Sequence, residues 1–292
     1  MTVARSALRQ EIAKRMGRPI VGTVTSSSTA SVLFDQDDEF VTFQEEGGPE
    51  LQGWWIVLPA ASATNRVRRV SFHDKGSGQL KPSRAWSAAP ANGDTYELWP
   101  PDMHPNRVDE AINRGLPQLR HLTEETLTLV GGDNDYTLSY SWLENERDVY
   151  EVYHEITSSL RIYRSEYEWF KVHRDNAVFK LRLWPIPYTT SNYAVIIEGR
   201  ARYATLATDA ATTDCPTDWA AAVGHVELLR HLIRQNHGQD VSRFEKELME
   251  ARRVLRKMTV RYAPRRGRRI MPRTPTSMPG NPSTPRRGEF LY

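Results

Sequence analysis

The sequence predicts an α+β protein in which a helical domain carries two antiparallel β regions. Short alternating apolar runs separated by turn residues fill 20–101 and 125–214, as strands require. Apolar residues at helical spacing fill 102–124 and 215–262 instead. Because these two helical segments flank the second β region, we expect them to pack together. The β region would then project from one end of them as an insertion.

The first 19 residues are predicted to contain an N-terminal helix. Residues 2–16 form an amphipathic pattern, and Gly17 and Pro19 would end the helix. The segment lacks the apolar core of a signal peptide, so we expect it to be part of the folded protein.

The following segment, 20–101, is predicted to be a small barrel-like β-module. Its linking stretches are rich in Gly, Pro, Asn and Asp, the residues that turns require. Several short strands in a segment of this length favour a small barrel or sandwich. The candidate strands are 20–25, 30–34, 54–58, 69–72 and 95–99.

A helix is predicted over 102–122, where Pro105 suits the first turn because its missing N–H would be unpaired there anyway. Gly115 and Pro117 lie inside the pattern, so we expect a kink or an early end near them. One face of this helix would carry Val108, Ala111, Ile112, Leu119 and Leu122.

The insertion at 125–214 is predicted to be an antiparallel β-sandwich. Two alternating runs joined by a Gly, Asp and Asn loop predict a hairpin over 126–140. Residues 146–206 alternate again, in four runs. Along one of them the apolar Phe179, Leu181 and Leu183 alternate with the charged Lys180 and Arg182, as in a strand with one solvent-exposed face.

A helical hairpin is predicted over 217–260, with its turn at 236–240. In its second half, Ser242 and Glu245 have the spacing of a capping box. The first helix would pack through Trp219, Val223, Val226, Leu229 and Ile233. The second shows apolar spacings of three and four, a narrow seam for one partner helix, at Val241, Phe244, Leu248, Ala251, Leu255 and Met258.

The residue types of catalytic and metal sites do not form the patterns that such sites require. Cys215, the single cysteine, precedes a predicted helix start, but it is best explained as a small residue in the turn. His225, His231 and His237 are six apart, whereas a zinc-binding helix needs a spacing of three or four. The sequence therefore predicts no enzyme, no cofactor and no metal site.

Two acidic stretches and the tryptophans also have structural explanations. DQDDE at 35–39 and GGDND at 131–135 lack the twelve-residue ligand series of an EF-hand, so we read them as turns. No stretch of about 18 apolar residues is present, which excludes a membrane-spanning helix. Seven of the eight tryptophans lie in or beside the β regions, where cores and interfaces use such rings, although glycan-binding sheets do too.

The last segment, 263–292, is predicted to be an extended basic arm. Residues 261–292 hold six prolines, eight arginines and one acid, Glu289, so helices and central strands are excluded. This stretch contributes +7 to the net charge of +3, so residues 1–260 sum to −4. A mildly acidic body with a basic arm is not built to grip nucleic acid over a broad face. The arm could instead bind an acidic protein groove, or phosphate.

Residues 54–99 resemble a β-module that recurs in virion proteins of tailed bacteriophages. The matching features are the apolar strand at 54–58, Arg68 and Arg69, Trp86, and the closing GDTYEL at 93–98. The proline usually found beside Trp86 is absent.

The helical segments extend this resemblance to about residues 50–260. HPNRVDEAINRGL at 104–116 is similar to the helix that follows this module in phage neck proteins. YATLATD at 203–209 and CPTDWAAAVGHVELL at 215–229 look like the second half of head-to-tail connectors, or adaptors.

The resemblance implies a structural role in the neck of the virion, between capsid and tail, for a protein made in the host cytoplasm. Such adaptors form a ring, commonly of twelve copies, that joins the portal to a tail or nozzle protein. The ring continues the channel through which genomic DNA passes without sequence-specific binding. A protein without a catalytic constellation fits this role.

Within this role we predict that the arm is a docking segment that binds the portal or a neighbouring subunit. Its guanidinium groups would pair with carboxylates, and two terminal aromatics would enter apolar pockets. The predicted partner-binding residues are Arg265, Arg266, Arg268, Arg269, Arg273, Arg286, Arg287, Phe290 and Tyr292.

Three alternatives remain open from the sequence. The chain could be another neck, tail or baseplate component of a virion. It could be a carbohydrate-binding receptor module that uses the aromatics of the β regions. It could also bind nucleic acid through the arm alone, with an affinity that falls steeply with salt.

Overall fold

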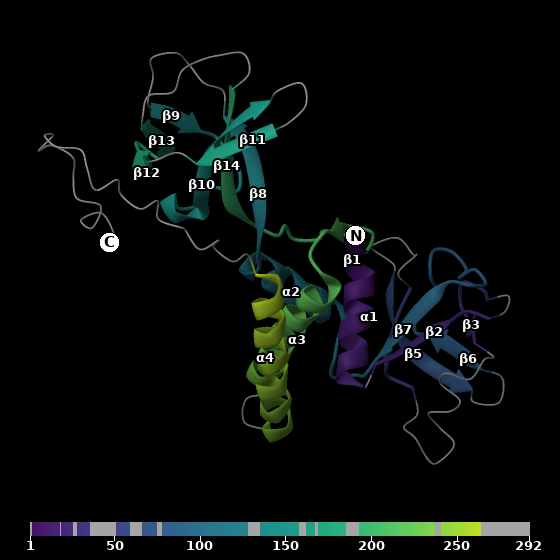
Figure 1. The fold of residues 1–292 in the computed structure, drawn as a ribbon. Helices are drawn as coiled ribbons and strands as arrows, with labels where there is room; N and C mark the ends of the chain where they lie inside the picture. The colour runs from purple at the N-terminus through teal and green to yellow at the C-terminus, as the bar shows by residue number, and fades with distance from the viewer. Residues whose placement is uncertain are drawn as a thin grey trace, which may run out of the picture.

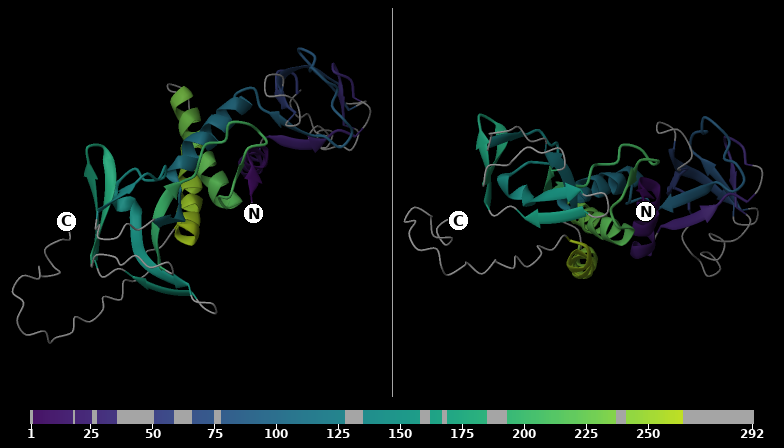
Figure 2. Two further views of the ribbon diagram at one scale, coloured as in Figure 1. Left: turned by 90° about the horizontal axis from the view of Figure 1, so that it is seen from above. Right: turned by 45° about the horizontal axis from the view of Figure 1, so that its top comes forward.

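The helices lie in the middle of the molecule, with one β region on each side (Figures 1 and 2). The described part of this computed structural model has four α-helices and several antiparallel sheets, the α+β class that the sequence predicts. None of the described helices is both long and apolar enough to cross a membrane. The structure describes residues 2–17, 19–25, 28–35, 51–58, 66–74, 78–127, 135–157, 162–166, 169–184, 193–236 and 241–263.

The helical body is built around α3, which packs against the other three helices. Its core contains Leu8, Ile112 and Leu229, all fully buried, so the expected packing of the two helical segments is confirmed. The left-handed Gly17 ends the first helix, as predicted. The helices are α1 (Arg5–Met16), α2 (Pro105–Gly115), α3 (Thr217–Gln235) and α4 (Ser242–Tyr262).

Gly224 allows α1 and α2 to cross α3 closely. A Cβ atom at this position would lie 2.8 Å from Ile12 Cδ1 and 3.3 Å from Ile112 Cγ1, both inside ordinary contact distance. Because Gly224 has no side chain, α1 and α2 can both approach α3 closely at this point.

The β-module is a six-stranded antiparallel sheet that curls into a half-barrel. Its order is β2-β7-β4-β5-β6-β3, and the backbone N–H of Thr25, just after β2, donates to Phe34 O in β3 at 3.1 Å. Ile56, Leu80 and Tyr96 lie in its own buried core. The strands are β2 (Ile20–Thr23), β3 (Leu33–Phe34), β4 (Trp55–Val57), β5 (Val67–Asp74), β6 (Gln79–Pro82) and β7 (Thr95–Trp99).

The insertion consists of two antiparallel sheets, ordered β11-β10-β14-β8 and β12-β13-β9, that share a buried core. Leu181 and Leu183 are fully buried while Arg182 is exposed, as the alternation predicts. The strands are β8 (Arg120–Leu127), β9 (Asp135–Leu138), β10 (Val149–Thr157), β11 (Ile162–Glu166), β12 (Trp169–Asp175), β13 (Val178–Trp184) and β14 (Tyr193–Arg202).

One further pair of short strands ties the start of the chain to the segment that follows the insertion. β1 (Val3–Ala4) pairs antiparallel with β15 (Thr212–Thr213). Among the described residues, single-turn 3₁₀ helices occur at Leu116–Gln118 and Glu146–Asp148.

The helix predicted over 102–122 ends early, as expected near Gly115 and Pro117, so the last part of that range is not helical. It ends at Gly115, a 3₁₀ turn containing Pro117 follows, and β8 starts at Arg120. Glycine weakens the last turn and proline cannot donate the next helical hydrogen bond, so the chain leaves the helix there. Leu122, predicted on the apolar helix face, lies on β8 instead and is 46 % exposed.

The predicted hairpin over 126–140 is wrong. β8 pairs with β14 and β9 pairs with β13, so the two strands belong to different sheets of the sandwich. The alternating pattern predicted two strands correctly, but pairing depends on strands far away in the sequence.

Two local predictions also fail. Val241 is the N-cap of α4 and Ser242 is its first helical residue, so Ser242 does not take the non-helical N-cap position that a capping box requires. In the β-module, the predicted strands omit β6, because Lys81 and Pro82 do not continue an apolar alternation.

Candidate functional site

Arg9 of α1 is fully buried and connects the helical body to the β-module. Its Nε donates to Glu97 Oε2 at 2.6 Å, and its Nη2 donates to Glu97 Oε1 at 3.2 Å. Glu97 lies in β7, is also fully buried, and accepts a further hydrogen bond from Trp99 Nε1 at 2.9 Å. This two-point contact fixes the angle between α1 and the sheet.

The same guanidinium group also binds two other parts of the chain. Arg9 Nη1 donates to Asp109 Oδ1 at 2.8 Å and to Asp209 Oδ1 at 3.0 Å. Asp109 belongs to α2, whereas Asp209 belongs to the segment that leads from the insertion back to α3. One side chain therefore joins α1 to three other chain segments.

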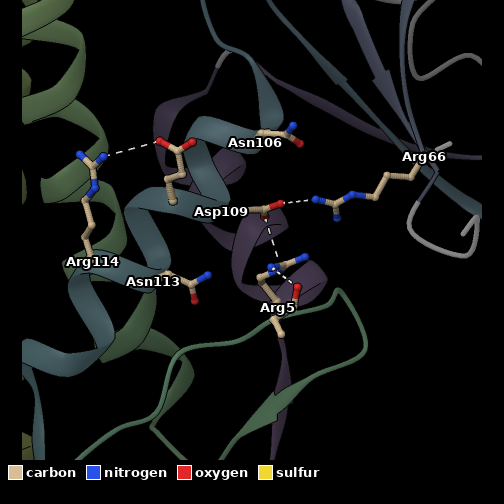
Figure 3. A pocket seen from close by; sticks show the side chains of 8 residues that line it. Arg5, Arg66, Asn106, Asp109, Asn113 and Arg114 are labelled. Carbon is tan, nitrogen blue, oxygen red and sulfur yellow. Dashed lines mark hydrogen bonds and ion pairs between the residues drawn. The ribbon is translucent and has the colours of Figure 1, made fainter. Parts of the chain in front are cut away.

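Arg5 and Arg66 complete the arrangement. Arg5 donates to Asp209 Oδ1 through Nε at 3.2 Å and to Leu206 O through Nη1 at 2.7 Å. Arg66, just before β5, forms ion pairs with Asp109 and Asp209. In Figure 3, Arg5 and Arg66 reach Asp109 from different sides. All six charged residues are buried, and we call them the junction cluster: Arg5, Arg9, Arg66, Glu97, Asp109 and Asp209.

The pKa values in the junction cluster reflect the balance between burial and opposite charge. Burial raises the pKa of Glu97 above its ordinary value, although Arg9 opposes this. Burial would also raise the pKa of Asp209, but hydrogen bonds and charge from Arg9 and Arg66 lower it well below its ordinary value. Three cations facing three carboxylates make the cluster neutral overall, which is how a protein tolerates buried charge.

A polar cavity of about 500 Å³ opens beside the cluster (Figure 3). Its floor is occupied by groups already bonded to one another. At its edge, Asn113 Oδ1 accepts from the Leu206 backbone N–H at 2.7 Å and Asn113 Nδ2 donates to Leu206 O at 3.1 Å. The lining residues are Arg5, Arg66, Asn106, Asp109, Glu110, Asn113, Arg114 and Ala207. This arrangement holds chain segments in a fixed geometry, and we assign it a positioning role.

Sequence reasoning missed the junction cluster, although one local signal was present. Arg5 and Arg9 lie on the same stripe of α1 as the buried Ile12 and Met16, at spacings of three and four. A cation inside an apolar stripe requires a buried counter-charge. That signal identifies Arg9, but not which acids bind it.

The structure also shows the surroundings of the residues that the sequence analysis considered as catalytic or metal-binding candidates. Cys215 is fully buried, and burial raises the pKa of its thiol to about 12, which disfavours a thiolate. Burial, with a contribution from Arg15, lowers the pKa of His225 to about 4. Within the described ranges, no group of three or more His, Cys, Asp or Glu side chains is placed to hold a metal ion.

Of the two acidic stretches, one residue each lies in the described part of the chain. Asp35 accepts a hydrogen bond from Tyr96 Oη at 2.5 Å, and Asp135 accepts from Arg182 Nε at 3.2 Å. Among the tryptophans, Trp54, Trp86 and Trp99 are buried, as core residues are. They are therefore not displayed to a glycan.

The predicted partner-binding residues of the arm lie outside the described residues. These are Arg265, Arg266, Arg268, Arg269, Arg273, Arg286, Arg287, Phe290 and Tyr292.

Comparison with known proteins gives one match. The family model described as "SU10 adaptor protein" matches residues 60–272, which is well over half of the chain. Neither the curated proteins nor the solved structures contain a match.

Proposed function

We propose that this chain, which belongs to the SU10 adaptor protein family, forms a ring that joins the portal of a bacteriophage to its tail. The family is one of phage adaptors, so the chain is a structural component of a virion. The proposed ring has twelve copies, lies in the neck and continues the channel for genomic DNA. The family match carries this proposal, and we propose no catalytic activity.

The extent of the match supports a role for the whole folded body. Residues 60–272 include three of the six β-module strands (β5, β6 and β7), the complete insertion, and α2, α3 and α4. The remaining helix, α1, is bound to this region through Arg9. The matched region and the N-terminal helix therefore act as one structural unit.

The junction cluster suits a subunit that must repeat identically around a ring. Ring closure requires every copy to present the same angle between its interacting surfaces. Arg9 fixes this angle between the helical body and the β-module through buried, charge-assisted hydrogen bonds.

The arm is proposed to dock on the portal or on a neighbouring copy. Its composition opposes independent folding, and such a segment can meet its ordering cost when it binds. The arginines from Arg265 to Arg287 would pair with carboxylates, while Phe290 and Tyr292 would occupy apolar pockets.

Native mass spectrometry of the full chain, alone and mixed with portal, tests the ring. We expect a discrete complex in which about twelve copies bind one portal, and a cryo-EM map should place them between capsid and tail. A chain that stays monomeric in the presence of portal would contradict the proposal.

Truncation after Tyr262 tests the arm separately. We expect a folded protein, by circular dichroism, that no longer joins the portal. Normal assembly of the truncated chain would remove the arm from the proposal and leave the ring intact.

A further inference from the structure

The C-terminal half of α4 carries an exposed basic face. Five cations occupy the last eleven residues of the helix, and all five are exposed. Residues 251–263 contain no acid. We call this surface the basic face of α4: Arg252, Arg253, Arg256, Lys257 and Arg261.

The other described helical surfaces carry ion pairs between residues three or four apart. Arg15 pairs with Glu11 in α1, and Glu110 pairs with both Arg107 and Arg114 in α2. In α3, Arg230 pairs with Glu227. The N-terminal half of α4 follows the same rule, with Arg243 paired to Glu247.

The basic face departs from this rule. Arg252 and Arg256, Arg253 and Lys257, and Lys257 and Arg261 are like charges four residues apart, which destabilises a helix. A single ion pair joins the face to a described acid, between Arg253 and Glu250 at 3.9 Å. The helix dipole favours cations only within the last turn, so it accounts for Arg261 and not for the four earlier ones.

The basic face points away from the rest of the molecule. α4 packs on α3 through Leu248, Ala251 and Leu255, which lie on the side of the helix opposite Arg253 and Lys257. Figure 2 (right) shows α4 nearly end-on at the edge of the helical body. Val260 lies between the cations and is 65 % exposed. A partner can therefore reach this surface without rearrangement of the fold.

The chemistry of the face fits phosphate better than a protein surface. Protein interfaces deplete charge at their centre and enrich aromatic residues, whereas this face is charged and its aromatic neighbour, Tyr262, stacks on Trp219. Cations four residues apart are spaced by about 6 Å along the axis and form two adjacent rows. A wide, two-row array matches a continuous polyanion.

We propose that the basic face of α4 binds the phosphate backbone of duplex DNA. This inference rests on one part of the proposed function, namely that DNA passes through the ring. The proposed DNA contact is restricted to this face, because the rest of the body is acidic. Residues 1–260 have a net charge of −4 although they include four of these five cations. Beyond α4 the same charge continues, since residues 251–288 contain twelve cations and no acid.

Fluorescence anisotropy of a labelled 30-base-pair duplex tests this with the full chain at several salt concentrations. The test variant replaces three exposed cations, by Arg252→Gln, Arg256→Gln and Lys257→Gln. We expect the slope of log K against log salt to decrease by about 2.7, with affinity at 0.1 M salt reduced on the order of 100-fold. The melting temperature of the test variant should be unchanged or slightly higher than that of the wild-type chain, because repulsion between like charges is removed.

A matched control removes the same charge elsewhere on the helical hairpin. Arg234→Gln, Arg243→Gln and Lys246→Gln also replace three exposed cations, and this variant should keep the wild-type affinity and most of the salt slope. Equal losses in both variants would show a net-charge effect and overturn the inference.

Two further outcomes would also overturn it. The wild-type chain could show no binding at 0.05 M salt, or the test variant could bind DNA normally but fail to join the portal, which would make the face a protein-docking surface. Failure of DNA binding with normal ring assembly would leave the proposed function standing. Failure of the wild-type chain to assemble, with normal DNA binding, would contradict the function and not this inference.

Discussion

The two β regions are attached to the same helical body in different ways. The β-module contributes Val57 and Trp99 to the core of the helical body, and Glu97 binds Arg9 inside the junction cluster. The insertion has its own core, and among the described residues its strands β8 to β14 contribute none to the core of the body. Its two connecting strands, β8 and β14, lead into the body next to Leu119 and Tyr203, which belong to the body's core.

We call the attachment of the β-module to the helices through the junction cluster the fixed joint. We call the insertion, which is attached through β8 and β14, the tethered lobe. Buried ion pairs have strict geometry, and losing one partner leaves a charge uncompensated. The insertion has a charged pair within its own chain near its base, Arg120 with Asp148 at 3.1 Å, and Arg120 is partly exposed. We therefore expect the β-module and helices to unfold together, and the insertion to be energetically more independent.

Replacing the central arginine should have the largest effect. Arg9→Met removes the cation that Glu97, Asp109 and Asp209 share, and buried carboxylates without their partner cost about 3–5 kcal/mol. The measurement is urea unfolding followed by tryptophan fluorescence.

The matched control is Arg120→Met in the insertion. Its pair with Asp148 is partly exposed, so we expect a loss of about 1 kcal/mol or less. Similar losses for the two variants would show that the buried junction cluster contributes no more stability than a partly exposed pair within the insertion.

Sequence patterns predicted the parts of the fold that depend on neighbouring residues. The spacing of Trp219, Val223 and Val226 identified α3, and the alternation of Leu181 with Arg182 identified β13. A residue's neighbours determine which of its faces is apolar, and therefore whether it lies in a helix or a strand.

The contacts that join the regions could not be predicted in this way. Arg9 and Asp209 are 200 residues apart, and no local pattern links them. The strand partners of β8 and β9 were predicted incorrectly for the same reason. The candidate site is therefore a product of the tertiary fold, with Arg9 in the apolar stripe of α1 as its one local signal.

Acid should reduce the stability that the ion pairs of the junction cluster contribute more than the stability that surface ion pairs of the insertion contribute. The folded-state pKa of Asp209 is lowered, so its ion pairs contribute stability above the ordinary pKa of Asp, near 3.8, and lose it as the pH falls further. Asp209→Asn should remove this loss. It should also lower stability at neutral pH by about 2 kcal/mol, because a charged partner of Arg9 is lost.

Two comparisons make the acid prediction specific. The raised pKa of Glu97 has the opposite sign, since protonation at low pH favours the folded state, so the variant is needed to isolate Asp209. Asp135 also has a lowered pKa, from its hydrogen bond with Arg182, but it lies at the surface of the insertion. Asp135→Asn should leave the acid profile nearly unchanged. An unchanged profile in Asp209→Asn as well would contradict the assignment.

A methyl group at the helix crossing should have an intermediate effect. Gly224→Ala places a Cβ 2.8 Å from Ile12 Cδ1, whose end can rotate, and 3.3 Å from Ile112, so overpacking should cost about 1–2 kcal/mol. Because α1 also carries Arg9, a shift of this helix should disturb the junction cluster. A double-mutant cycle with Arg9→Met should therefore show coupling, and additive losses would contradict it.

Excision of the insertion should have the smallest effect on the rest of the protein. His121 and Ala201 are paired across β8 and β14, so an Asn-Gly turn in place of residues 122–200 would close a short hairpin. The shortened chain keeps Leu119, Tyr203 and the complete junction cluster, and it loses the partly exposed Arg120 pair. We expect the helices and β-module to unfold in one transition, within about 1 kcal/mol of their stability in the full chain.

Replacing the β-module residues 20–99 by a linker instead removes Glu97 and should abolish folding, because Arg9 would lose its two-point partner. If the chain without the insertion is unfolded, or the chain without the β-module folds normally, the fixed joint and the tethered lobe have been assigned to the wrong regions.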